Sequence, residues 1–327
     1  MNVARRGRVS RVLAGVIRAS SSLILGLLAC HGDAPLQRRG PTPREEAVAL
    51  LEQARRDVEQ SPPAKRRTGG ELELPAPSAQ GVGPLPLLVF LHGLGGSGAE
   101  LSAGLHLKEY SEQLGFAYLA PDGMLDGSGR RFWNAGESCC NFERREVDHI
   151  GLLRGWIQEA LLQPRVDAAR VYLVGYSNGG FLAHRAACEL GSLVRGIFSI
   201  GGAGPNPGQV CQPDRSPSIV EIHGDEDPIV AFAGGHLFAD RSRPRHPSSE
   251  ATVRAWSKRS GCGDKPVHRA DLDLEPRIPG AETQVLAYPG CPGNPVELWR
   301  IRGGGHGAGL SRLTVLSIWQ VIQGKPL

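Results

Sequence analysis

The feature that most constrains the fold of this chain is a serine between two glycines, where an apolar run meets a helix-like segment. Residues 171–174 have the composition of a buried strand, and residues 181–190 have that of a helix. Between them stands Gly175-Tyr176-Ser177-Asn178-Gly179. Small residues on both sides allow a strand and a helix to pack around a very tight turn. The context predicts that Ser177 is exposed on this turn as a nucleophile for acyl transfer.

The spacing of this motif is weak evidence by itself. A chain with 44 glycines among 327 residues would contain roughly 0.4 copies of Gly-x-Ser-x-Gly by chance. The alternative interpretation is a turn serine that caps the next helix. The strand before it, the helix after it and the later order of serine, acid and histidine favour the nucleophile.

A serine hydroxyl needs a base, and His306 is the predicted base. It stands in Gly303-Gly304-Gly305-His306-Gly307, after the last strand-like run and before the final helix. The glycines give this loop the freedom to aim an imidazole at Ser177. His184, on the helix after the serine, is expected to have an interior role instead.

The acid that orients the imidazole should follow a strand between the serine and the histidine. The loop after residues 218–222 offers Asp225, Glu226 and Asp227. Asp227, directly before Pro228, is the predicted acid, and Asp225 is the rival candidate. Plain solvation of a charged loop is the alternative to both.

Two backbone N–H groups are needed to stabilise the negative charge that develops on the substrate oxygen. One should belong to Asn178, the residue after the nucleophile. The other is assigned to Leu94, in the glycine-rich loop of residues 91–98. This loop lacks the Lys-Ser/Thr of a phosphate-binding P-loop, and His92 within it is expected to be structural.

Short apolar runs bounded by glycine and proline alternate with helical patterns along most of the chain. This alternation predicts an α/β fold, with a mostly parallel sheet covered by helices on both faces. The expected strands are 86–91, 116–120, 171–174, 196–200, 218–222, 284–288 and 296–301. The expected helices are 100–113, 147–162, 181–190, 249–260 and 310–323.

The N-terminal region differs from the rest in charge. Residues 1–72 carry a net charge of +6 and the remainder carries −2, so the folded part has no nucleic-acid-binding pattern. Residues 1–29 combine an arginine-rich start with a short apolar stretch, which predicts a lipoprotein signal peptide with Cys30 as the lipidated residue. The alternative is an ordinary signal peptide. Residues 30–69 are predicted to be a tether with a short amphipathic helix, and 70–327 to be the catalytic domain.

Six cysteines remain once Cys30 is set aside, and an even number in an exported chain predicts disulfides. Cys262–Cys291 is the predicted pair. Adjacent Cys139 and Cys140 are expected to pair separately with Cys188 and Cys211, because a ring between neighbours is strained. No spacing matches a zinc site, so no metal and no cofactor are expected.

Together these motifs resemble the α/β-hydrolase family that contains polyhydroxybutyrate depolymerases, feruloyl esterases and acetylxylan esterases. By that resemblance Ser177, Asp227 and His306 match the family's triad. The resemblance runs from about Pro84 to the end of the chain. The matching segments are 91–93, 121–123, 132–136 with Cys139-Cys140, 147–148, 175–180, 223–230 and 304–306.

Three positions depart from the family pattern. His149 stands where the family often has a second aspartate, Ala231-Phe232 where it often has Pro-Tyr, and residues 307–310 where it often has Thr-Trp-Pro-Gly. The last two are near the expected substrate pocket, so the family's substrate preference is not carried over. Trp133, beside the cysteine pair, is predicted to present its ring to the substrate, with a core role as the alternative.

The resemblance implies a serine esterase that forms an acyl-enzyme on Ser177, the N-terminal segment implies export, and a monomer is expected. Its substrates would be hydroxyalkanoate oligomers or feruloyl and acetyl esters of polysaccharide. It would be secreted or anchored through Cys30 as an outer-membrane or cell-surface lipoprotein. A serine peptidase on the same fold, or an inactive hydrolase fold used for binding, are the alternatives.

Overall fold

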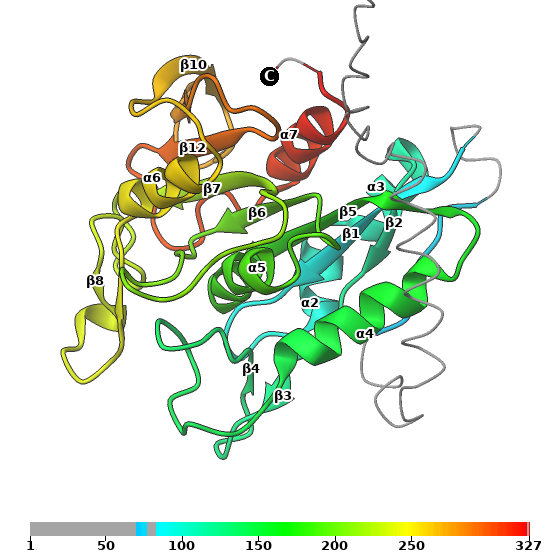
Figure 1. Cartoon of the computed structure of the whole chain (residues 1–327), viewed down its shortest axis with the longest axis horizontal. Coiled ribbons are helices and arrows are strands. Elements are labelled where there is room, and N and C mark those ends of the chain that lie inside the picture. The colour runs from blue at the N-terminus through cyan, green and yellow to red at the C-terminus, as the bar shows by residue number, and fades with distance from the viewer. Residues whose placement is uncertain (1–69, 77–82, 326) are drawn as a thin grey trace, which may run out of the picture. The chain divides into compact units, whose positions relative to one another are not determined.

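The computed structural model of the chain describes residues 70–76, 83–325 and 327. The predicted signal peptide, the lipidation of Cys30 and the tether of residues 30–69 lie outside the described residues. The described residues form an α/β fold built on one large sheet (Figure 1).

Eight strands form this sheet in the order β10-β11-β12-β7-β6-β5-β1-β2. The six from β12 to β2 run parallel. At one edge β11 pairs antiparallel with β12, and β10 pairs antiparallel with β11. The parallel strands are β1 (Leu85–Leu91), β2 (Ala117–Leu119), β5 (Val166–Tyr176), β6 (Gly196–Ile200), β7 (Ser218–Gly224) and β12 (Val296–Ile301). The edge strands are β10 (Val267–Leu272) and β11 (Thr283–Ala287).

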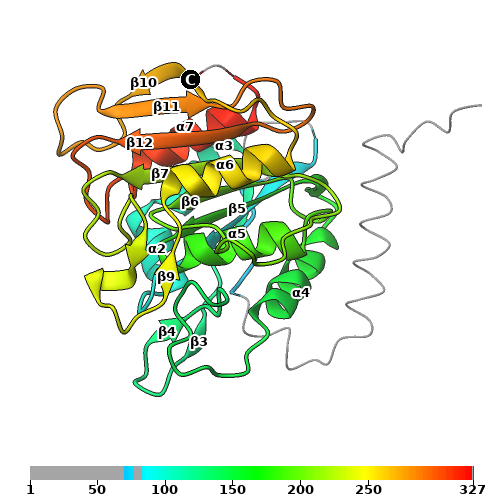
Figure 2. The same ribbon diagram turned by 60° about the vertical axis from the view of Figure 1, so that its left-hand side comes forward.

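Helices cover both faces of the sheet, as Figures 1 and 2 show. One face packs on α4 (His149–Leu161), α5 (Asn178–Glu189) and α6 (Ser249–Arg259). The other face packs on α2 (Gly98–Gly104), α3 (Leu107–Leu114) and α7 (Arg312–Ile322). The predicted mostly parallel sheet with two covered faces is confirmed.

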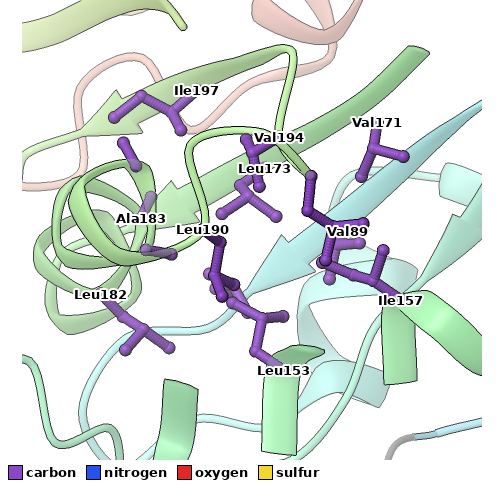
Figure 3. Packing of buried hydrophobic residues seen from close by; sticks show 14 of the residues in the cluster. Val89, Leu153, Ile157, Val171, Leu173, Leu182, Ala183, Leu190, Val194 and Ile197 are labelled. Atoms are coloured by element: carbon purple, nitrogen blue, oxygen red, sulfur yellow. The ribbon is translucent and has the colours of Figure 1, made fainter. Parts of the chain in front are cut away.

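The alternating side chains of the strands divide the core into two layers. On β1, Val89 points to the layer of α4 and α5, and its neighbour Phe90 points to the layer of α2 and α3. Figure 3 shows the first layer, in which Val89 packs with Leu153 and Ile157 of α4. Burial of such side chains stabilises the fold by about 1.5–3 kcal/mol each.

Local sequence explains where several helices begin. The side chains of Asp148, Ser248 and Ser311 accept hydrogen bonds from backbone N–H groups in the first turns of α4, α6 and α7. Such caps satisfy donors that the helix itself leaves free.

Two expectations about secondary structure were wrong. The single helix expected over 100–113 is two helices, α2 and α3, because His106 adopts a left-handed conformation (φ 54°) between them. Strand β10 was not expected, because as an edge strand it is largely exposed and carries His268, Arg269 and Asp271 in place of an apolar run. Two short hairpins, β3–β4 (Met124–Leu125, Arg131–Phe132) and β8–β9 (Gly235–His236, Arg245–His246), were also missed.

Three disulfides are present among the described residues. Cys262–Cys291 is confirmed. The separate pairing of Cys139 and Cys140 with Cys188 and Cys211 is wrong: the neighbours bond to each other across a cis peptide bond. The reason lies at the other pair. Cys188 on α5 and Cys211 have Cα atoms 4.9 Å apart and bond together, so neither is free for a third cysteine.

No helix within residues 70–76 and 83–325 has the length and apolar character needed to span a membrane. In the same part of the chain, His, Cys, Asp and Glu side chains do not cluster in a way that could hold a metal ion.

Candidate active site

The predicted site residues gather at the carboxyl ends of the parallel strands. Ser177 directly follows β5, Asp227 follows β7, and His306 follows β12. Leu94 follows β1, which lies next to β5 on the side away from β6. In open α/β sheets, ligands bind at this edge.

Ser177 occupies a strained turn between β5 and α5. Its backbone has φ 53° and ψ −118°, outside the regions that a serine normally adopts. The glycines on either side make the turn sterically possible. A Cβ on Gly175 would lie 2.2 Å from the carbonyl oxygen of Gly179, and one on Gly179 would lie 2.1 Å from that of Leu91. The strand, turn and helix predicted around Ser177 are therefore present.

His306 bridges the serine and the acid. Its Nε2 lies 2.9 Å from Ser177 Oγ, and its Nδ1 lies 2.7 Å from Asp227 Oδ2. A carboxylate can only accept, so Nδ1 carries the proton and Nε2 offers its lone pair to the serine hydroxyl. The imidazole also lies beside the Tyr176 ring, with centroids 5.4 Å apart. This geometry allows the imidazole to take the proton from Ser177.

Asp227 is buried and fully engaged as a hydrogen-bond acceptor. Its Oδ1 accepts from the backbone N–H groups of Ile229 (2.8 Å) and Val230 (2.9 Å). Its Oδ2 accepts from His306 and lies 3.2 Å from His223 Nε2. Burial alone would raise the pKa of Asp227, but the hydrogen bonds from His223 and His306 outweigh it and hold the pKa well below its usual range.

The rival acid, Asp225, has a different role. Its Oδ2 pairs with the Arg300 guanidinium at 2.9 Å, and its Oδ1 accepts from the N–H of Gly303 at 2.7 Å. These contacts tie the acid loop to the loop that carries His306. Among the described residues no hydrogen bond joins Asp225 to that imidazole.

The two residues assigned to the oxyanion hole lie on segments that pack together. A Cβ on Gly93 would lie 3.1 Å from the Tyr176 ring and 3.4 Å from Ser177 Cβ, so the loop before Leu94 lies against the turn. Asn178 is in the first turn of α5, where backbone N–H groups have no acceptor within the helix.

His92 supports the loop of residues 91–98 through two hydrogen bonds. Its Nδ1 donates to the carbonyl of Gly93 (2.7 Å), and its Nε2 accepts from the N–H of Gly123 (2.9 Å). Burial lowers its pKa, so the imidazole is neutral. The structural role expected for His92 is in line with these contacts.

Trp133 does not present its ring to a site that substrate can reach. The residue is 0% exposed, its Nε1 donates to the carbonyl of His92 (2.9 Å), and its ring packs on His92 and Trp156. The burial favours the alternative, a core role. The sequence could not show the contacts between Trp133 and His92, which lie 41 positions apart.

The Asn178 side chain has a structural task that the sequence did not reveal. Its Oδ1 accepts from Trp133 N (2.7 Å) and its Nδ2 donates to Trp133 O (2.9 Å). The same Nδ2 lies 3.6 Å from Cys139 Sγ. One amide therefore satisfies both backbone groups of a buried tryptophan and attaches the segment next to the cysteine pair to the turn of Ser177.

His149, which replaces the aspartate common in the resembling family, is also buried. Its Nδ1 accepts from the N–H of Asn134 at 2.8 Å. Burial, reinforced by the nearby Arg185 charge, lowers the pKa of His149 to about 4. A neutral imidazole here supports the segment of Trp133 without adding a charge.

A set of buried polar residues lies behind Asp227; the interior role expected for His184 is in line with its burial, but the sequence did not reveal the contacts that join the set. His223, Glu221, His184 and Trp256 form a continuous hydrogen-bonded chain that ends in the core. The signal in the sequence was a glutamate on a fully buried strand, flanked by apolar residues, since such a charge requires a partner.

Known proteins with related sequences are esterases. The sequence profile of the phospholipase/carboxylesterase family matches residues 141–250, which include Ser177 and Asp227. "Putative esterase NocK" of Nocardia uniformis subsp. tsuyamanensis is 27% identical over 228 residues, 68% of this chain and 64% of that protein. "Feruloyl esterase B" of Piromyces equi is 27% identical over 230 residues, 68% of this chain but 40% of that protein. The chain thus spans less than two thirds of either relative.

A solved structure supports the fold. The acetyl xylan esterase from Aspergillus awamori superimposes with a TM-score of 0.54 at 14% identity, covering 77% of this chain and 93% of that one. The described residues thus have an α/β-hydrolase fold. The predicted resemblance to feruloyl and acetylxylan esterases is confirmed by relatives that carry these names.

Proposed function

We propose that the protein hydrolyses carboxylic esters through an acyl-enzyme on Ser177, with His306 as general base and Asp227 as the acid. The observation that carries this proposal is the unbroken hydrogen-bonded path from Ser177 Oγ to His306 (2.9 Å) and on to Asp227 (2.7 Å). The strained conformation of Ser177 is a second support, because strain of this kind is maintained where function requires it.

The proposed reaction follows from the positions of the protons. His306 Nε2 takes the hydroxyl proton of Ser177 while Oγ attacks the ester carbonyl carbon. The N–H groups of Leu94 and Asn178 would stabilise the oxyanion. His306 then gives the proton to the leaving alcohol, which yields the acyl-enzyme and the free alcohol. Water, deprotonated by the same imidazole, releases the acid and restores Ser177.

The substrate class is an extension from the relatives. Proteins named feruloyl esterase and acetylxylan esterase match this chain, so feruloyl and acetyl esters of polysaccharide are proposed first. Esters of hydroxyalkanoate oligomers are a further proposal. A screen of these three substrate classes with the soluble domain would rank them.

We also propose export. The three disulfides are compatible with an oxidising compartment. The arginine-rich, apolar N-terminus ending at Cys30 supports a lipoprotein signal over residues 1–29, with residues 30–69 as the tether of a catalytic domain that spans 70–327. A lipid on Cys30 would hold the enzyme at a membrane surface.

The test is hydrolysis of p-nitrophenyl acetate by the wild type and by Ser177→Ala and His306→Ala. Each substitution should reduce kcat by at least about 10³-fold, because triad members act as a unit. His268→Ala is the matched control, because this histidine is exposed on edge strand β10, and its kcat should be unchanged. A His306→Ala enzyme with near wild-type kcat would reject the assignment. Turnover of aminoacyl amides in place of esters would indicate a peptidase.

A further inference from the structure

A chain of buried polar side chains leads from Asp227 into the core, on the side opposite His306. It passes through His223 and Glu221 on β7, His184 on α5 and Trp256 on α6. None of these four is more than 1% exposed. A protein interior normally excludes such groups, so each proton in the chain must have a definite place.

At the end of this hydrogen-bonded series farthest from Asp227, Trp256 determines which ring nitrogen of His184 carries the proton. Trp256 Nε1 lies 3.0 Å from His184 Nδ1, and an indole nitrogen can only donate. His184 Nδ1 therefore accepts, which leaves the ring proton on Nε2. That Nε2 lies 2.8 Å from Glu221 Oε2 and donates to it. Glu221 thus receives one hydrogen bond from a neutral imidazole.

At the end of the series nearest Asp227, the contacts of His223 Nε2 show that this nitrogen carries a proton. Its Nε2 lies 2.8 Å from the carbonyl oxygen of Val230 and 3.2 Å from Asp227 Oδ2. A backbone carbonyl cannot donate, and the Asp227 carboxylate already accepts from other groups. His223 Nε2 must therefore carry a proton and donate towards both oxygens.

One further proton lies between His223 and Glu221. His223 Nδ1 and Glu221 Oε1 are 3.0 Å apart, and without a proton two lone pairs would face each other. Ser249 Oγ lies 2.8 Å from the same Nδ1 and can accept from it. With the proton on Nδ1, His223 is a cation that pairs with the Glu221 carboxylate.

Charges on both sides favour this cation. Burial alone would lower the pKa of His223, but hydrogen bonds to Asp227 and Glu221 outweigh it and raise the pKa to about 9. Burial would raise the pKa of Glu221, yet His184 and His223 lower it. The other titratable group facing His223 is His246 at β9, whose pKa is lowered by burial, so it adds no charge at neutral pH.

We propose that His223 is a positioning residue that acts through Asp227 as a fixed imidazolium, charged by the buried Glu221. This inference rests on the proposed roles of Asp227 and His306. Asp227 Oδ2 then lies between two imidazoles, one charged at neutral pH and one charged only during the reaction. His223 holds the carboxylate in place, and its charge weakens the pull of Asp227 on a proton at His306. The base consequently stays free to act at lower pH.

Glu221→Gln tests the proposal with little change of shape. The Gln amide can accept from His184 through its oxygen and donate to His223 Nδ1 through its nitrogen, which leaves His223 neutral. Asp227 then attracts the His306 proton more strongly. The acid limb of kcat/KM should move up by about 0.5–1 pH unit. A uniform loss of kcat/KM with an unmoved limb would show a structural role and overturn the proposal.

Ser249→Ala is the matched control, because its hydroxyl touches the same His223 nitrogen and carries no charge. Its acid limb should stay in place. A shift as large as that of Glu221→Gln would show that an uncharged contact suffices, which would also overturn the proposal.

A second measurement needs neither variant nor activity. In wild-type protein with ¹⁵N-labelled histidine, one of the ten histidines should keep both ring nitrogens protonated at pH 8. Finding none in that state would refute the inference. If instead the wild type fails to hydrolyse esters while this signal is present, the proposed function is wrong and the buried cation remains.

Discussion

The geometry of Asp227 allows the effect of Asp227→Asn to be worked out atom by atom. Two backbone N–H groups, from Ile229 and Val230, donate to Oδ1. In the variant the amide oxygen must take that position, because an NH₂ group there would face two donors. The amide NH₂ is then directed at His306 Nδ1. His306 must accept on Nδ1, so its proton moves to Nε2 and points at Ser177.

This tautomer cannot take the proton from the serine hydroxyl, which is the step that activates the nucleophile. In the serine-protease triad, the same aspartate-to-asparagine change costs about 10⁴-fold in kcat. We expect about 10³–10⁴-fold here, equivalent to about 4–5.5 kcal/mol of transition-state stabilisation. The fold should survive, because His223 still donates to the carbonyl of Val230.

Asp225→Asn is the matched control on the same loop. It weakens a partly exposed ion pair with Arg300, which is worth about 1 kcal/mol or less, and it keeps an oxygen for the Gly303 N–H. Its kcat should stay within about threefold of wild type. The assay is hydrolysis of p-nitrophenyl acetate at pH 7.5, with circular dichroism to verify folding. Greater damage from Asp225→Asn than from Asp227→Asn would refute this reasoning and move the acid to Asp225.

Two other predictions concern Trp133 and Cys30. Because the ring is buried, Trp133→Ala should lower the free energy of unfolding by about 3–5 kcal/mol and reduce turnover of acetyl and feruloyl esters alike. A variant that is as stable in urea as the wild type and loses turnover of feruloyl esters alone would contradict this. Export-matured protein, measured unreduced by mass spectrometry, should begin at Cys30 with added acyl chains; an unmodified N-terminus at another residue would exclude the lipoprotein.

The parts of the fold that the sequence predicted well have strong local signals. The turn at Ser177 requires Gly175 and Gly179 for steric reasons, so these two glycines indicate the tight turn in the sequence. The parallel strands carry mostly apolar runs because both faces are covered. By contrast, β10 is an edge strand with mixed polarity, and the break at His106 depends on a single left-handed residue, so neither had a periodic signal.

The sequence was least informative about contacts between distant segments. The pairing of Cys139 with Cys140 followed from the position of Cys188 beside Cys211, which composition cannot reveal. The burial of Trp133 depends on Asn178, 45 positions later in the chain, whose side chain satisfies both of its backbone groups. The Cys188–Cys211 and Asn178–Trp133 contacts join segments that are distant in the sequence, and therefore have no periodicity along the chain.

The choice between Asp225 and Asp227 shows how such contacts assign function. Because β7 and β12 pair in parallel, the acid loop and the base loop leave the sheet together. Their backbones touch so closely that a Cβ on Gly224 would lie 2.1 Å from the carbonyl oxygen of Gly304, and Glu226 N donates to that same oxygen at 3.0 Å.

Two carboxylates on one loop consequently have separate tasks. Asp225 holds the base loop through Gly303 and Arg300, and the chain then turns so that Asp227 meets the imidazole of His306. In the proposed mechanism this backbone contact between two loops brings Asp227 to the imidazole; the sequence favoured Asp227, but it carried no local signal for the contact itself.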